Sequence, residues 1–174
     1  QTVLNPASDG PKPVVISPNP FYQIYEGATI LGGGEIYFAN CPAPSFNPDW
    51  SNLPEDVWQR TKVLIVCSPN NPSGSVLQLE DWKEIFDLQD KYGFVIVSDE
   101  CYSEIYFDGN KPIGGLQAAA QLGRGTRNII MFTSLSKRSN VPGLRSGFVA
   151  GDAELLKNFL LYRTYHGSAM SIPV

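Results

Sequence analysis

The sequence predicts an α/β fold whose sheet is covered by helices on both faces. Short, almost continuously apolar runs alternate along the chain with longer segments that have helical spacing. The apolar runs lack the strict alternation of a sheet that has one face in water. This order and this character are typical of a layered α/β domain.

The expected elements follow one another through most of the chain. Buried strands are expected at residues 13–16, 35–38, 62–67, 94–98, 128–132 and 147–150, and helices at residues 21–31, 79–92, 113–122 and 152–165. Gly93 directly follows the second helix and is predicted to end it. Gly32-Gly33-Gly34 follows a helix and precedes a strand, the reverse of the dinucleotide-binding order, so we interpret it as a helix stop.

Composition and charge favour a globular protein with a small-molecule partner. The 174 residues are 43% hydrophobic and 17% charged, with a net charge of −4, and the basic residues are scattered. This pattern argues against binding to nucleic acid or to a membrane surface. The three cysteines, Cys41, Cys67 and Cys101, lack the spacing of a disulfide framework or a zinc site, so we expect no metal and a reducing, cytoplasmic location.

The ends of the sequence suggest a longer polypeptide. The chain begins with Gln1 rather than Met and stops at Val174 without a closing element. We therefore expect residues 1–174 to be a fragment.

Polar clusters follow three of the predicted strands: residues 68–74, 99–102 and 133–137. Ligands of open α/β sheets bind beyond the carboxyl ends of the strands, so these clusters are predicted to converge on one crevice. A lysine near a strand end is usually solvated, but Lys137 follows Ser134 and Ser136 and precedes Arg145. Hydroxyls and a guanidinium group suit a phosphate. A lysine amine beside them suggests an anchored aldehyde.

The other clusters offer groups for an aromatic ligand. Asp99 is either a helix N-cap or a carboxylate that keeps a pyridine nitrogen protonated, and the two interpretations are compatible. If a helix begins there, Tyr102 lies one turn further on the same side. Asn71 is either a turn residue or a donor to a phenolate oxygen. Tyr22 can stack on a flat ligand, with Phe21 as the alternative, whereas core packing is the expectation for Tyr25.

Together, these clusters resemble the class I/II aminotransferases, which are pyridoxal-phosphate enzymes of fold type I. Asn71-Pro72-Ser73-Gly74 matches the family's Asn-Pro-x-Gly, Asp99-x-x-Tyr102 its Asp-x-x-Tyr, and Ser134-x-Ser136-Lys137 with Arg145 its lysine motif. The resemblance implies a three-layer α/β/α fold with a mostly parallel, mixed sheet. Residues 1–174 would then be part of the large cofactor-binding domain, without the N-terminal segment and the small C-terminal domain.

The resemblance also implies the roles of the residues toward pyridoxal 5'-phosphate. Lys137 would form the Schiff base and then transfer the catalytic proton. The other implied contacts are Asp99 at the ring nitrogen, Asn71 and Tyr102 at the phenolate oxygen, Tyr22 on the ring, and Ser134, Ser136 and Arg145 at the phosphate. Catalysis by the single histidine, His166, is not expected.

Residues 67–74 and 134–152 are similar to those of bacterial succinyldiaminopimelate aminotransferases of lysine biosynthesis. This implies transfer of an amino group between N-succinyl-diaminopimelate and 2-oxoglutarate by a cytoplasmic homodimer. The alternatives are another class I aminotransferase, a C–S lyase on the same scaffold, and a regulatory domain that binds the cofactor without turnover. A polypeptide of only these residues is expected to bind the cofactor weakly and to be inactive.

Overall fold

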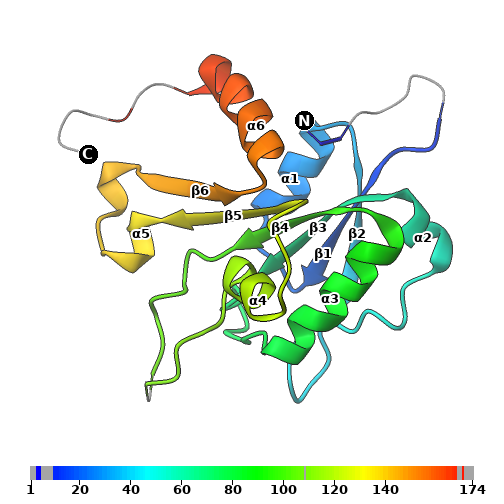
Figure 1. Cartoon of the computed structure of the whole chain (residues 1–174), viewed down its shortest axis with the longest axis horizontal. Coiled ribbons are helices and arrows are strands. Elements are labelled where there is room, and N and C mark those ends of the chain that lie inside the picture. Colours follow the sequence, from blue (N-terminus) through cyan, green and yellow to red (C-terminus); the bar gives the residue numbers. More distant parts are fainter. Residues whose placement is uncertain (1–2, 5–9, 108, 168–169, 171–174) are drawn as a thin grey trace.

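A computed structural model describes residues 3–4, 10–107, 109–167 and 170. Their strands form one six-stranded sheet in the order β2-β1-β3-β4-β5-β6 (Figure 1). Strands β1 to β5 pair in parallel, and β6 pairs antiparallel with β5, which confirms a mostly parallel, mixed sheet. The strands are β1 (Val14–Asn19), β2 (Glu35–Asn40), β3 (Thr61–Cys67), β4 (Val95–Asp99), β5 (Ile129–Ser134) and β6 (Gly147–Gly151).

Helices cover both faces of this sheet (Figure 1). They are α1 (Ile24–Leu31), α2 (Glu55–Arg60), α3 (Leu79–Tyr92), α4 (Gly115–Gln121), the short α5 (Leu135–Arg138), the 3₁₀ turn η1 (Pro142–Leu144) and α6 (Ala153–His166). On one face, Trp58 of α2, Trp82 of α3 and Ala118 of α4 share a core with Leu64. On the other face, Tyr25 of α1 packs in a second core with Val63. The three-layer prediction is therefore confirmed.

Strand β3 explains why the apolar runs are nearly continuous. Leu64 and Val66 belong to the core under α2, α3 and α4, whereas Val63 and Ile65 belong to the core under α1. Successive side chains of a strand point to opposite faces, so a strand buried on both faces is apolar at every position.

The predicted strands and helices all appear; α3 has the predicted bounds, and the others have shifted ends. The first helix begins at Ile24 rather than at residue 21, and the first strand continues to Asn19. The sequence did not predict α2, α5 or η1, because six residues or fewer are too few to show a helical period. Gly93 ends α3 as predicted, in the left-handed conformation with φ of 76°. Among the described helices, none is both long and apolar enough to cross a membrane.

Substitution of two glycines by alanine tests how tightly the helix layers pack. A methyl group on Gly115 of α4 would lie 3.0 Å from the ring of fully buried Trp82, whereas nothing lies within 4 Å of such a group on Gly27 of α1. In the full polypeptide, Gly115→Ala should lower the free energy of unfolding by about 1–3 kcal/mol, because the core is overpacked. Gly27→Ala should raise it by roughly 0.5–1 kcal/mol, because alanine loses less backbone entropy in a helix. Urea unfolding measures both, and equal effects would contradict this packing.

Candidate functional site

A pocket of about 420 Å³ lies at the carboxyl ends of β1, β3, β4 and β5. It contains every site residue singled out from the sequence, and Tyr25, Cys101 and Pro142 complete its lining. The lining residues are Tyr22, Tyr25, Asn71, Asp99, Cys101, Tyr102, Ser134, Ser136, Lys137, Pro142 and Arg145. The predicted polar clusters therefore converge on one crevice, of a size that suits a small ligand.

The register of the parallel strands brings these side chains together. Cys67 at the end of β3 pairs with Asp99 at the end of β4, and Asp99 pairs with Phe132 of β5. Strand β5 continues for two more residues to Ser134, and Lys137 follows in α5. Asp99 thus ends one strand, and Lys137 lies just beyond the end of the neighbouring strand.

Asp99 is hydrogen-bonded on both of its carboxylate oxygens. The Tyr25 hydroxyl donates to Oδ2 at 2.6 Å, and the backbone N–H of Cys101 donates to Oδ1 at 3.1 Å. No helix begins at Asp99, because the described chain turns at residues 101–104, so the N-cap interpretation is wrong. The carboxylate instead caps a turn, and Tyr102 in that turn still lines the pocket.

The basic end of the pocket is built on a short helix. Ser134 caps α5: its Oγ accepts from the N–H of Ser136 at 3.1 Å and lies 2.9 Å from the Ser136 hydroxyl. Lys137 Nζ lies 6.0 Å from the centre of the Tyr102 ring. Arg145 follows η1 in the left-handed region, with φ of 51°, and donates to the carbonyl of Pro142 at 3.0 Å. Two hydroxyls and a guanidinium group can bind a phosphate here.

The loop that presents Asn71 is closed on itself. Asn70 accepts from the N–H of Gly74 at 2.8 Å through its backbone carbonyl and donates to Ser73 Oγ at 2.8 Å through its side chain. Gly74 has φ of 75°, in the left-handed region that glycine adopts without strain. These bonds fix the turn in which Asn71 reaches the pocket.

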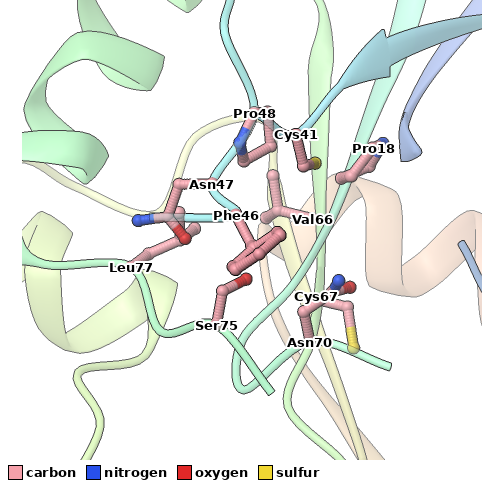
Figure 2. A pocket seen from close by; sticks show the side chains of 10 residues that line it. All are labelled: Pro18, Cys41, Phe46, Asn47, Pro48, Val66, Cys67, Asn70, Ser75 and Leu77. Carbon is pink, nitrogen blue, oxygen red and sulfur yellow. The ribbon is translucent and has the colours of Figure 1, made fainter. Parts of the chain in front are cut away.

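The loop that follows β2 packs against the loop of Asn71. Figure 2 shows Phe46 of the first loop close to Ser75 of the second. Asn47 and Asn70 line the same cavity, which measures about 10 Å³. The Asn47 amide also donates to the carbonyl of Val76 at 3.4 Å. Residues far apart in the sequence thereby support the turn at Asn71.

Some of the aromatic residues after β1 line the pocket, and others pack in the core. Tyr22 is 41% exposed and lines the pocket, whereas Phe21 stacks on Phe38, with ring centres 4.6 Å apart, away from the lining. The Tyr25 ring is buried in the core as expected, but its hydroxyl lies in the pocket. This second role was not predicted from the sequence, although Tyr22 and Tyr25 would lie on one face of the helix predicted at residues 21–31. His166, at the end of α6, is not among the lining residues.

Burial and the charge of Asp99 raise the pKa values of the phenol and thiol groups around it. Burial, followed by the effects of Cys67 and Asp99, raises the pKa of the Tyr25 phenol far above its usual value. Burial and then Asp99 raise the pKa of Cys67 to about 11 and that of Cys101 to about 12. The phenol and both thiols therefore keep their protons at neutral pH. Tyr25 is consequently a stable donor to Asp99.

A model of a known family matches residues 3–164, and its description is aminotransferase class I and II. The chain belongs to this family. Class I and II aminotransferases depend on pyridoxal phosphate.

Two curated relatives and two solved structures show how the chain compares. It is 39% identical over 145 residues to LL-diaminopimelate aminotransferase of Desulforudis audaxviator, covering 82% of this chain and 36% of the relative. It is 35% identical over 149 residues to LL-diaminopimelate aminotransferase of Moorella thermoacetica, and this match covers 84% of this chain and 37% of the relative. An aminotransferase structure from Neisseria meningitidis is 81% identical, with a TM-score of 0.95, covering 99% of this chain and 43% of that one. The structure of a probable N-succinyldiaminopimelate aminotransferase from Thermus thermophilus is 25% identical, with a TM-score of 0.85. This match covers 97% of this chain and 43% of that one. The chain thus spans less than half the length of these proteins.

The chemistry of Cys101 tests the geometry around Asp99 without reference to function. In the full polypeptide, Asp99→Asn removes a negative charge that raises the pKa of Cys101, so more thiolate forms at mildly alkaline pH. Alkylation of Cys101 by iodoacetamide, followed by peptide mass spectrometry, should become roughly tenfold faster. The matched control is Cys101→Ser in the same Asp99→Asn background, where labelling should fall to the level of the buried cysteines. An unchanged rate would show that Asp99 does not act on this thiol.

Proposed function

We propose that the polypeptide containing this chain is a pyridoxal-phosphate-dependent aminotransferase and that this pocket is its cofactor site. The observation that supports the proposal is the convergence of Asn71, Asp99, Lys137 and Arg145 from four separate segments on one pocket. Family membership gives the class of reaction. The pocket offers side chains that suit the phosphate, the aldehyde, the ring nitrogen and the phenolate oxygen of the cofactor.

The donor set of the pocket fits pyridoxal phosphate. Ser134, Ser136 and Arg145 offer hydroxyl and guanidinium donors for the phosphate, and Asp99 offers a carboxylate for the protonated ring nitrogen. Asn71 and Tyr102 can donate to the phenolate oxygen, and the Tyr22 ring can stack on the pyridine ring. We assign these roles to these residues.

Lys137 is the proposed catalytic residue. Its amine would hold the cofactor at the aldehyde carbon, and the amino group of the substrate would displace it. The bound cofactor supplies an electron sink for negative charge at the substrate α-carbon. The free Lys137 amine then takes the α-proton as a general base. Asp99 supports this step by holding a proton on the ring nitrogen.

The proposed substrates are an amino acid and a 2-oxo acid, specifically N-succinyl-diaminopimelate and 2-oxoglutarate. Support comes from the names of relatives, which include an LL-diaminopimelate aminotransferase and a probable N-succinyldiaminopimelate aminotransferase. We further propose that the enzyme works as a cytoplasmic homodimer in lysine biosynthesis. Light scattering of the full polypeptide at twice the monomer mass would support the dimer.

Borohydride reduction tests the assignment of Lys137. The full polypeptide, loaded with pyridoxal phosphate and reduced, should carry a pyridoxyl adduct on the peptide that contains Lys137, because reduction fixes the bond between the amine and the aldehyde carbon. Lys137→Ala should lose the adduct, whereas Lys157→Ala, on the exposed surface of α6, should keep it. An adduct on a different lysine would refute the assignment.

The reaction is tested by product analysis with a panel of amino donors and 2-oxo acids. The proposal expects glutamate formation from 2-oxoglutarate to be fastest with N-succinyl-diaminopimelate. Lys137→Ala should lower this rate by at least about a hundredfold, the usual contribution of a positioned general base. Pyruvate and ammonia from a sulfur amino acid would instead indicate a lyase. Cofactor binding without turnover would indicate a regulatory domain.

A further inference from the structure

The structure contains a buried phenol that points at the carboxylate of the site. Tyr25 is 8% exposed, and its hydroxyl donates to Asp99 Oδ2 at 2.6 Å. A hydrogen bond to a charged acceptor is shorter and stronger than one between neutral groups. The sequence motifs of the family resemblance do not include Tyr25, and the roles proposed above leave it without one.

The position of the Tyr25 hydroxyl is fixed by its surroundings. The ring packs in the core between α1 and the sheet, with Val15 and Val63. The Thr29 hydroxyl donates to the Tyr25 carbonyl at 2.7 Å, and the ring of Tyr22 meets that of Tyr25 edge to face at 5.8 Å. A hydroxyl on a ring held in this way cannot follow a moving carboxylate. It is therefore held in place beside Asp99 Oδ2.

Several titratable groups surround Asp99, and Tyr25 differs from them. The groups are Tyr22 and Tyr25 from the segment after β1, Cys67 from β3, Glu100, Cys101 and Tyr102 from the turn after β4, and Lys137 from α5. Among the described residues, Tyr25 is the one whose side-chain oxygen hydrogen-bonds to Asp99. Burial raises its pKa, so the phenol stays protonated and donates over the whole neutral range.

We propose that Tyr25 is a positioning residue that orients the Asp99 carboxylate to hold the proton of the cofactor's ring nitrogen. This inference rests on the proposed function. Without the phenol, Asp99 would keep the N–H of Cys101 as a partner on Oδ1 but would lose the one on Oδ2. A carboxylate held on one side is free to rotate away from the ring nitrogen. The electron sink of the cofactor would be weakened.

The test is a double-mutant cycle in the full polypeptide with pyridoxal phosphate. The variants are Tyr25→Phe, Asp99→Asn and the two combined. The control is Tyr92→Phe, since the Tyr92 hydroxyl donates to the Glu55 carboxylate, also at 2.6 Å, but on the surface. The measurements are the dissociation constant of the cofactor and the NMR signal of its isotopically labelled ring nitrogen, which reports protonation.

Tyr25→Phe should weaken cofactor binding by about tenfold, the size of one charge-assisted hydrogen bond, and should move the ring-nitrogen signal toward that of Asp99→Asn. In the Asp99→Asn background, Tyr25→Phe should weaken cofactor binding by less than about twofold, because Tyr25 acts through Asp99. Tyr92→Phe should match the wild type in both measurements.

The outcomes separate the two proposals. A wild-type protein that binds no cofactor, or that forms its adduct away from Lys137, would refute the proposed function. A wild-type protein with the Lys137 adduct would support it. The inference is overturned if Tyr25→Phe weakens cofactor binding equally with and without the Asp99 carboxylate, or if it leaves the ring-nitrogen signal unchanged. Tyr25 would then be only a packing residue.

Discussion

The parallel pairing of β4 with β3 on one side and β5 on the other is the interaction on which the site depends. It aligns Cys67, Asp99 and Phe132 across the sheet, so the segments that follow them reach the same edge. A shift of one residue in β4 would turn Asp99 to the opposite face and would also move Ile96 out of the core under α2, α3 and α4. The apolar core and the position of the carboxylate are therefore specified by the same register.

The side chains at the two ends of the pocket differ in how well their positions are fixed by other residues. Asp99 has partners on both oxygens, and its donor Tyr25 is anchored in the core. Lys137 and Arg145 are exposed, on a four-residue helix and after a 3₁₀ turn. The acidic end is thus preorganised by burial, whereas the basic end is ordered mainly by local bonds such as the cap at Ser134. A phosphate bound there would supply partners to groups that otherwise face solvent.

How far the sequence predicts this structure depends on whether local or distant residues determine each feature. The apolar strand of residues 62–67 and the stop at Gly93 depend on local chemistry, and both are found close to where they were predicted. The pocket residues were grouped correctly because the motifs directly follow strands. The six-residue helix α2 was missed, since its two buried residues, Val57 and Trp58, are too few to show a period.

The bond between Tyr25 and Asp99 shows most clearly what a sequence cannot reveal. The two residues are 74 positions apart, and each has a complete local explanation, Tyr25 as a core aromatic and Asp99 as a turn residue. Only the pairing of β1 with β3 and of β3 with β4 brings the end of α1 that holds Tyr25 to the end of β4. A tyrosine is suited to this boundary because its ring can be buried while its hydroxyl meets a charge. The core layer under α1 thus extends directly into the site, and a change in packing there would also change the chemistry of Asp99.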